Sequence, residues 1–269
     1  MLVLTLSVTN EDMLRAIDYN NIDFVMHFRH YNGDKGYYYS KNLKYISVRD
    51  YHRIVQTNFS NENDIVDLIN QLRMSNKLWS WIVGPTSKPY NLCQILEQNH
   101  FKKQAELTGM YLDLNNLGTD SATDFQVKKV CVNDDIDDWF DIFIQGFGIT
   151  AKHSERIKTL RYIYTELINE ENQLFHMYLG IYKNKPSVCC STFAKNGNVG
   201  IYDLATIPDM RRKRLASSMI NSILNQFRSD GNRFAVATAT DSGELLFTKL
   251  GFTPVGKFPL YKISQGIVR

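Results

Sequence analysis

The residues most able to do chemistry lie together in one stretch, from Tyr202 to Ala216. This stretch leaves a predicted strand at 199–205 and enters a predicted amphipathic helix through a basic turn. Consecutive cations fill that turn, from Arg211 to Arg214. Backbone N–H groups at a helix start and the helix dipole favour a bound anion, and the cations add positive charge at the same place. The arrangement is typical of a pyrophosphate site.

The basic run also has two simpler interpretations. Charge runs are most often solvated turns, and basic clusters also serve as nuclear-import or nucleic-acid patches. This run lies within a single turn of a folded element, and the net charge of +3 is small for 269 residues. A dedicated nucleic-acid binder usually carries a larger and more clustered basic excess, so we expect no nucleic-acid partner.

The stretch resembles the signature of the GNAT superfamily of N-acetyltransferases, in which a strand leads into Pro-x-x-Arg-x-x-Gly-x-Gly/Ala. Pro208, Arg211 and Ala216 match that pattern. The block at 243–252, GELLFTKLGF, resembles the family's later helix, which ends in Leu-Gly-Phe. The resemblance covers about residues 125–263. It implies an N-acyltransferase that transfers an acetyl or other acyl group from acetyl-CoA (acyl-CoA) to an amine of a small molecule or a protein.

The resemblance also implies where the co-substrate lies. Acyl-CoA is expected in the splay between the predicted strands at 199–205 and 234–239, with the pantetheine arm along the backbone of the first strand. Acceptor choice is expected to depend on the connection at 146–150 and on the last strand near Phe258 and Pro259. The expected cofactor-binding residues are Leu204, Ala205, Thr206, Arg211, Arg212, Lys213, Arg214, Leu215, Ala216, Thr240 and Phe247.

The chain departs from the family pattern at the first loop glycine, where it has Arg214. Glycine lets backbone approach a phosphate closely. A helix-start position is expected to have a negative φ that arginine adopts without strain. Arg214 then either points outward, pairs with a phosphate, or obstructs the site. We expect CoA binding to be retained.

A second departure concerns the general acid. The family often uses a tyrosine in the last short helix to protonate the departing thiolate, and the matching residue here is Phe247. Thr240, Ser242, Tyr202 and Tyr261 are candidates to replace it, directly or through water, although each also fits a purely structural role.

The general base is equally open. Gly200 stands near the position where some relatives have a glutamate, and Asp203 is the nearest carboxylate. Strand alternation predicts that Asp203 lies on the face opposite Tyr202 and Leu204, unless a bulge intervenes. The catalytic residues therefore stay unassigned. Two non-catalytic alternatives remain: a CoA-binding or acyl-CoA-binding module without turnover, and a scaffold whose loop no longer binds CoA.

The surrounding elements predict a mixed α/β domain with one central sheet. Two helices come first, then a three-strand meander, then helix, strand, helix and strand. The predicted helices are 136–147, 155–169, a strong amphipathic helix ended by Asp230 and Gly231, and 243–250. The predicted strands are 173–182, 187–194, 199–205, 234–239 and 255–263.

The N-terminal half is similar to the N-terminal domain of bacterial two-domain GNAT proteins, where it is a degenerate copy of the same fold. The resemblance rests on the segment at 81–89, on Leu92, Leu96 and Phe101, and on the segment at 109–114. This half lacks the basic loop, so we expect no second CoA site. The polar stretch at 115–121 predicts a boundary between domains at 1–118 and 122–269.

Elements of the N-terminal half are predicted at five places. Helices are expected at 11–30, 63–74 and 90–99, and strands at 78–83 and 106–114. A group of aromatic residues and histidines offers no ligand geometry and is expected to form core or wall: His27, His30, Tyr37, Tyr38 and Tyr39.

Composition limits the remaining classes. With 43% hydrophobic residues the chain has material for two cores, and no apolar run is long enough to span a membrane. The start at 1–7 is too short for a signal peptide. No metal spacing occurs among the cysteines, which are expected to be reduced: Cys93, Cys131, Cys189 and Cys190. We expect a cytoplasmic protein without a metal.

Overall fold

The computed structural model describes residues 8–28, 37–40, 42–48, 51–118, 122–131, 135–150, 154–169 and 174–263. His30 and the side chains of Tyr37, Tyr38 and Tyr39 lie outside this description. The helices are α1 (Asn10–His27), α2 (Glu62–Met74), α3 (Leu92–Gln98), α4 (Asp135–Phe147), α5 (Ser154–Ile168), α6 (Leu215–Ser229) and α7 (Asp241–Lys249), with short 3-10 turns η2 (Leu114–Asn116) and η4 (Pro208–Met210).

Within these ranges, all the strands belong to one 11-stranded mixed sheet in the order β1-β2-β3-β4-β11-β5-β10-β9-β8-β7-β6. The strands are β1 (Tyr37–Ser40), β2 (Leu43–Val48), β3 (Tyr51–Thr57), β4 (Ser80–Ile82), β5 (Phe101–Asp113), β6 (Phe125–Lys129), β7 (Phe175–Tyr182), β8 (Lys185–Lys195), β9 (Asn198–Thr206), β10 (Phe234–Ala239) and β11 (Thr253–Ile263). The predicted mixed α/β class is confirmed.

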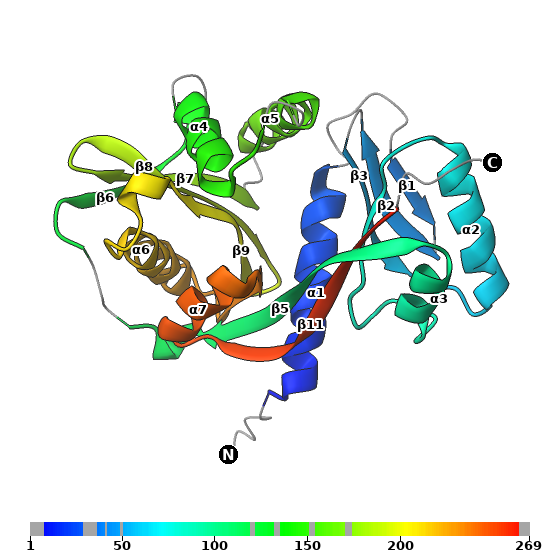
Figure 1. Ribbon diagram of the computed structural model, residues 1–269. Helices are drawn as coiled ribbons and strands as arrows, with labels where there is room; N and C mark the ends of the chain where they lie inside the picture. Colours follow the sequence, from blue (N-terminus) through cyan, green and yellow to red (C-terminus); the bar gives the residue numbers. More distant parts are fainter. Residues whose placement is uncertain are drawn as a thin grey trace, which may run out of the picture.

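The two halves of the chain exchange strands at the centre of this sheet. β11, from the C-terminal half, pairs with β4, and β5, from the N-terminal half, pairs with β10. β5 and β11 also pair with each other, antiparallel, along most of their length. Figure 1 shows these two long strands crossing the middle of the molecule, with one half on either side. Neither half therefore completes its sheet with its own strands alone.

Helix α1 lies across this centre and packs against strands of both halves (Figure 1). It begins with a capping box between Thr9 and Asp12, which satisfies the free N–H groups of its first turn. Its apolar residues Ile17 and Phe24 join a core cluster that also contains residues of α4, α5 and β3. In the C-terminal half, a separate cluster lies beneath α6 and α7. A third cluster lies beneath α2 and α3 in the N-terminal half.

The predicted helices and the meander are found near their expected positions, but four strands were missed: β1, β2, β3 and β6. Apolar and polar residues do not alternate along β3, because both faces of this strand are covered. Ile54 and Val55 are buried in different clusters. β5 begins at Phe101, earlier than predicted. Its first part, with Lys102 and Lys103, is polar in sequence and is a strand because β11 pairs with it.

Candidate functional site

The predicted splay between β9 and β10 is present. The two strands run parallel and pair from Asn198 opposite Phe234 to Ile201 opposite Ala237, and the pairing ends there. β9 continues to Thr206 along β8, whereas β10 continues to Ala239 along β5. The edge of β9 that faces β10 is therefore open over Leu204, Ala205 and Thr206. An extended ligand could pair with this edge as a strand would.

A β-bulge lies where the strands separate. Tyr202 pairs with Ser191 and Ala205 with Cys189, so two residues of β9, Asp203 among them, stand opposite Cys190. Asp203 has a left-handed backbone with φ of 53°. The bulge places Tyr202 and Asp203 on the same face, against α1 and α5 respectively. Simple alternation was therefore wrong for this pair, because the extra residue of a bulge resets the side-chain order.

The basic loop between β9 and α6 is attached to helix α4. The Arg211 guanidinium donates to the carbonyl oxygens of Thr206 at 3.1 Å and Gly146 at 2.7 Å. A side chain at Gly146 would come within 2.6 Å of the Ala205 Cβ, so glycine permits this close approach. Lys213 donates to the Asp209 carbonyl oxygen at 3.2 Å. These contacts hold the loop beside the open end of β9, where Figure 1 shows it in yellow below α4.

Arg214 is the N-cap of α6 and has a left-handed backbone, with φ of 58° and ψ of 12°. The expectation of a negative φ was wrong. The position has the conformation that favours glycine, and arginine adopts it because the loop must turn sharply into the helix. No side-chain hydrogen bond caps α6, and its first turn contains no acidic residue. The N–H groups of Leu215 and Ala216 therefore begin a helix whose start suits an anion.

The start of α7 provides hydroxyl groups across the splay. Thr240 caps the helix by accepting from the Gly243 N–H at 3.4 Å, and its hydroxyl lies 3.3 Å from that of Ser242. Phe247 is buried and packs on Phe252, with ring centroids 4.8 Å apart. It belongs to the same apolar cluster as Leu215 at the start of α6. The position that holds a tyrosine in the family is thus part of the core here.

The Tyr202 side chain contacts helix α1 through both its hydroxyl group and its ring. Its hydroxyl donates to Asn20 Oδ1 at 2.6 Å and lies 3.1 Å from Asn21 Oδ1, and its ring stacks on Phe24 at 4.0 Å. Burial raises its pKa well above the usual range. A side chain at Gly200 would come within 2.0 Å of Asn20 Oδ1. Helix α1 therefore occupies the space where a glutamate at position 200 would lie.

Asp203 is half-buried and belongs to a hydrogen-bonded group with two hydroxyls. Tyr164 of α5 donates to its carboxylate at 2.8 Å, and Ser191 of β8 donates to the same oxygen. Burial raises the pKa of Asp203, while these two hydrogen bonds and the charge of Arg53 oppose the rise. A carboxylate with a raised pKa is better suited to accept a proton near neutral pH than an exposed one.

Sequence reasoning missed Tyr164, Ser191 and Arg53. Arg53 and Ser191 stand in other strands, and only the folded sheet brings them near Asp203. Tyr164 carried a usable signal: it lies on the apolar face of α5 beside Leu160 and Ile163, and a buried tyrosine hydroxyl usually has a partner.

Tyr261 and Phe258 lie away from the splay. The Tyr261 hydroxyl donates to Glu97 Oε1 at 2.7 Å within the N-terminal cluster, so this hydroxyl is not available to a thiolate. Phe258 is completely buried against Gly109 and cannot form part of an acceptor surface. His27 lies 5.2 Å from the Phe193 ring, which agrees with its expected role as wall.

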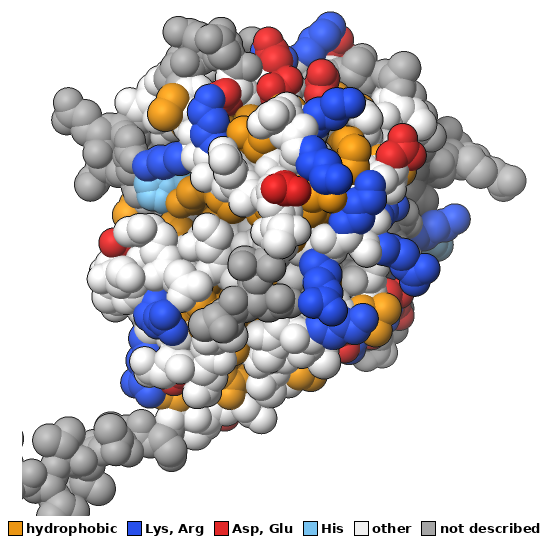
Figure 2. Space-filling model, turned by 90° about the vertical axis from the view of Figure 1, so that its left-hand side faces the viewer, with side chains coloured by type: hydrophobic (Ala, Val, Ile, Leu, Met, Phe, Trp, Pro, Cys, Tyr) orange, Lys and Arg blue, Asp and Glu red, His pale blue; other side chains and the backbone are white. Residues whose placement is uncertain are grey.

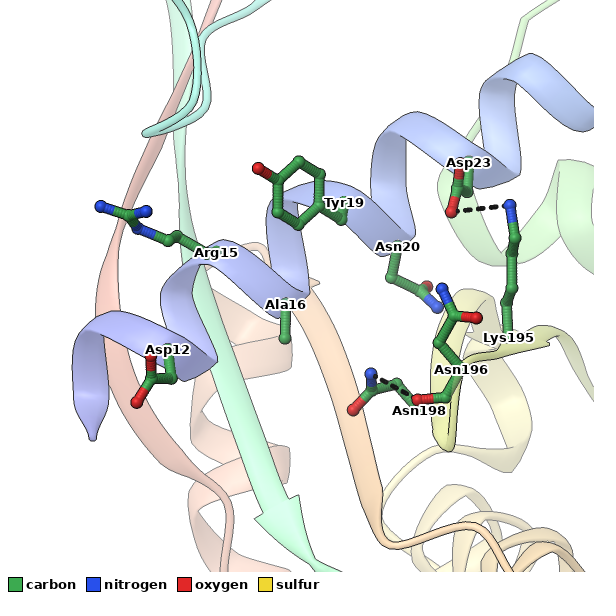
Figure 3. Close-up of a pocket in the computed structure, with 9 residues that line it drawn as sticks. All are labelled: Asp12, Arg15, Ala16, Tyr19, Asn20, Asp23, Lys195, Asn196 and Asn198. Carbon is green, nitrogen blue, oxygen red and sulfur yellow. Dashed lines mark hydrogen bonds and ion pairs between the residues drawn. The ribbon is translucent and has the colours of Figure 1, made fainter. Parts of the chain in front are cut away.

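A separate groove of about 350 Å³ lies between α1 and the β8–β9 turn (Figure 3). It stands at the start of β9, near Asn198, whereas the basic loop follows the end of that strand. Its charged residues already have partners: Lys195 pairs with Asp23 at 2.9 Å, and Arg15 pairs with Glu11. This groove is not the predicted site.

One face of the C-terminal half carries many basic side chains. Figure 2 views the side that carries β6 and α6, where Lys and Arg side chains gather, with some acidic side chains among them. Such a face raises the local concentration of anions. The described residues include no group of acidic, histidine and cysteine side chains that could hold a metal ion. The helices within the described ranges include none long and apolar enough to cross a membrane.

Solved structures with a similar fold include GCN5-related N-acetyltransferases (GNAT). One from Kribbella flavida is 12% identical, with a TM-score of 0.68 over 95% of this chain and 97% of that chain. A tandem GNAT protein from the clavulanic acid biosynthesis pathway is 8% identical, with a TM-score of 0.61 over 98% of both chains. One from Sphaerobacter thermophilus is 13% identical, with a TM-score of 0.60 over 84% of this chain and 77% of that chain.

Neither a family model nor a curated protein sequence matches the chain. At such low identities the structural likeness establishes the fold, and it does so over both halves of the chain. The expected GNAT fold is confirmed in this sense, and the boundary between domains at 1–118 and 122–269 stays a prediction.

Proposed function

We propose that this protein is an N-acyltransferase that transfers an acetyl or other acyl group from acyl-CoA to an amine. The observation that carries the proposal is the open edge of β9, which leads directly into a basic loop and an uncapped helix start. The GNAT fold supports acyl transfer as the general chemistry. The acceptor amine belongs to a small molecule or a protein.

In this proposal the pantetheine arm of CoA pairs with the backbone of Leu204, Ala205 and Thr206. The pyrophosphate lies on the N–H groups at the start of α6, where the helix dipole favours negative charge. The remaining contacts come from the residues around it: Arg211, Arg212, Lys213, Arg214, Leu215, Ala216, Thr240 and Phe247. Arg211 acts mainly by holding the loop, since its guanidinium already donates to two carbonyl oxygens.

The amine nitrogen then attacks the thioester carbonyl carbon, the new C–N bond forms, and the C–S bond breaks. We assign the released amine proton to Asp203, whose carboxylate lies in the bulge at the opening of the splay. Tyr164 and Ser191 fix the orientation of that carboxylate. The departing thiolate takes its proton from water or from the hydroxyls of Thr240 and Ser242.

The second candidate is a CoA-binding module with little or no turnover. The buried Phe247 favours it, because the usual acid is absent and general-acid catalysis is worth about 10²- to 10⁴-fold. Titration with acetyl-CoA by calorimetry is the first test, and micromolar binding supports both candidates. No binding up to millimolar concentration contradicts both and leaves a scaffold.

The Phe247→Tyr variant then separates the two candidates. Thiol release is measured for the native protein and the variant with a panel of amines. A rate gain of about tenfold or more in the variant supports an enzyme that lacks an efficient acid. Tight CoA binding with no thiol release from any amine contradicts the acyltransferase and supports the module.

A further inference from the structure

Three cations gather where the two halves of the chain meet, and the charge of one of them, Arg53, acts on Asp203. Arg53 lies in β3, Arg156 in the first turn of α5, and Lys262 near the end of β11. Arg53 and Lys262 both stand opposite Ser80 in the sheet, on either side of β4, so they share one face. We call Arg53, Arg156 and Lys262 the seam cluster.

A buried tyrosine organises the two arginines. The guanidinium carbon of Arg156 lies 5.0 Å from the Tyr51 ring centroid, and that of Arg53 lies 5.3 Å from it. Tyr51 is 5% exposed, so its ring is a fixed surface against which both guanidinium groups rest. Such stacking orients the planar donors of arginine while it leaves their N–H groups able to bind an anion.

Within the described ranges of the chain, the seam cluster has no acidic partner of its own. Among the residues that the structure describes, no carboxylate oxygen lies within ion-pair distance of Arg53, Arg156 or Lys262. Asp203 is the nearby carboxylate, and it already accepts from Tyr164 and Ser191. Burial lowers the pKa of Arg156 and of Lys262, and the repulsion from Arg53 lowers both further.

Two other cations of α5 differ from Arg156 because they have carboxylate partners. Arg161 pairs with Asp137, and Lys158 pairs with Glu155 at 2.7 Å, although both lie on a well-solvated surface where such pairs contribute little. Arg53 and Arg156 are partly buried. Partly buried cations without a carboxylate are more costly than exposed ones, and an anion would relieve that cost. If the seam cluster only stabilised the fold, we would expect its cations to be paired with carboxylates.

The cluster also lies beside the reaction centre assigned above. Tyr164, which lies on the same helix as Arg156, donates to Asp203 in the bulge of β9. Figure 1 shows α5 beside β3 near the top of the view, where the two halves of the chain meet, and the two elements are in contact. An acceptor whose anionic end rests on the seam cluster can therefore extend its amine toward the opening of the splay.

We propose that the seam cluster binds the carboxylate of the acceptor, so that the substrate class is small amines that also carry a carboxylate. Arginine matches a carboxylate with two parallel hydrogen bonds, and Lys262, which is exposed, adds charge at the entrance. This inference rests on the proposed acyltransferase function and deepens it. It also explains why the site includes residues of both halves.

The test uses matched probe pairs on the full-length protein: glycine and glycinamide, 4-aminobutanoate and 4-aminobutanamide, and 6-aminohexanoate and its amide. Binding of each probe is measured by calorimetry with and without saturating CoA, and thiol release from acetyl-CoA is measured in parallel. At least one acid is expected to bind about tenfold or more tightly than its amide. Arg156→Gln is expected to reduce that preference about 10- to 100-fold, and Arg156→Lys to recover part of it.

Arg161→Gln is the matched control, because Arg161 lies on the same helix but already has a carboxylate partner. It should leave the preference unchanged. If Arg156→Gln fails to fold, as judged by thermal unfolding, Arg53→Gln replaces it. Equal binding of acids and amides, no binding of any probe, or equal losses for both members of a pair in the variants would each overturn the inference.

These outcomes are distinct from failure of the proposed function. If acetyl-CoA does not bind but the acids still bind through the seam cluster, the acyltransferase proposal fails while the carboxylate site stands. If neutral amines are acetylated as well as their acidic counterparts, the acyltransferase stands and the carboxylate site is overturned.

Discussion

The two halves of the molecule contain the same sequence of strand, turn and helix, but only one of them leaves a helix start open to a ligand. In the N-terminal half, β3 leads into α2 through a short turn at 58–61. In the C-terminal half, β9 leads into α6 through the longer basic loop at 207–214. In both halves the strand pairs in parallel with the strand after the helix, and then the two diverge.

The helix starts differ in charge and in capping. Asn61 caps α2 by accepting from the Asn63 N–H at 2.9 Å, and Glu62 and Asp64 stand in its first turn. α6 has neither a side-chain cap nor an acidic residue in its first turn. A capped helix start with two carboxylates satisfies its own N–H groups and repels an anion.

The open strand edges differ as well. Beyond the point of divergence, the Thr57 carbonyl oxygen of β3 accepts from the Lys88 N–H at 2.7 Å, and the Thr57 hydroxyl donates to the Lys88 carbonyl oxygen at 2.9 Å. The chain's own segment thus fills the place that corresponds to the pantetheine position proposed on β9. The two halves therefore differ at both places: in the N-terminal half the helix start is capped and the strand edge is paired.

The strongest way to break this comparison is to give α6 the acidic first turn of α2. Ser217→Asp places a carboxylate at the third position of α6, where α2 has Asp64. We expect acetyl-CoA affinity, measured by calorimetry, to fall about 100-fold or more, because the carboxylate caps the N–H groups and repels the pyrophosphate.

The free energy of unfolding should rise in the same variant by about 0.5 kcal/mol, because a negative charge at a helix start is favourable. Asp64→Ser in α2 is the matched control and should leave acetyl-CoA affinity unchanged. An unaltered affinity in Ser217→Asp would show that the pyrophosphate does not lie at α6.

A second prediction concerns the segment that fills the N-terminal splay. Asp18 of α1 accepts from the Thr86 N–H at 2.9 Å and from its hydroxyl at 2.6 Å, and so anchors this segment. Burial raises the pKa of Asp18 to about 6, against the opposing effect of the Thr86 hydrogen bonds. A raised folded-state pKa means that its stabilising contribution is complete below the unfolded pKa near 4 and is lost as pH rises through 6.

Urea unfolding at pH 4.5, 6 and 7.5 tests this sign. Asp18→Asn keeps an acceptor for Thr86 but has no charge to bury, so its stability relative to the native protein should increase with pH, by up to about 3 kcal/mol at pH 7.5. Asp12→Asn on the same helix is the control. Hydrogen bonds from Thr9 lower the pKa of Asp12, so that variant should lose stability relative to native above pH 4. A relative stability of Asp18→Asn that is independent of pH contradicts the prediction.

A third prediction tests how the loop is held. Arg211→Lys keeps the positive charge but loses the planar fork that joins the carbonyl oxygens of Thr206 and Gly146. We expect acetyl-CoA and dephospho-CoA affinities to fall equally, by about tenfold, since the loop and not one phosphate contact is disturbed. Arg228→Lys, at the far end of α6, is the control and should change neither affinity. A larger loss for acetyl-CoA than for dephospho-CoA would place Arg211 on the 3′-phosphate instead.

Elements of the fold that produce a pattern of apolar residues within their own sequence could be predicted. The amphipathic face of α6, with Met219 and Ile223, predicts both the helix and its buried side. The loop signature and the block at 243–252 predicted which strands diverge. The strand exchange between β5 and β11 had no local signal, because pairing depends on residues more than a hundred positions apart, such as Phe101 and Ile263.

The candidate site divides in the same way. Its loop could be read from Pro208 and Arg211, but the bulge that turns Asp203 toward Tyr164 could not be read from alternation. The negative φ expected for Arg214 was wrong for a related reason: arginine gives no sequence signal of a left-handed turn, whereas the family's glycine does.

The last prediction uses that left-handed residue to sharpen the comparison between the two helix starts. Arg214 has φ of 58°, whereas Asn61 at the start of α2 has φ of −116°. Arg214→Gly should raise the free energy of unfolding by about 0.5 to 1 kcal/mol, because glycine adopts the left-handed region without strain. Asn61→Gly, in an extended conformation, should instead lower it by a few tenths of a kcal/mol through loss of the cap. Acetyl-CoA affinity of Arg214→Gly should stay within about fivefold of native, since the backbone N–H groups of α6 supply the site. A loss of stability in Arg214→Gly would mean that the arginine side chain contributes more to the loop than its backbone strain costs.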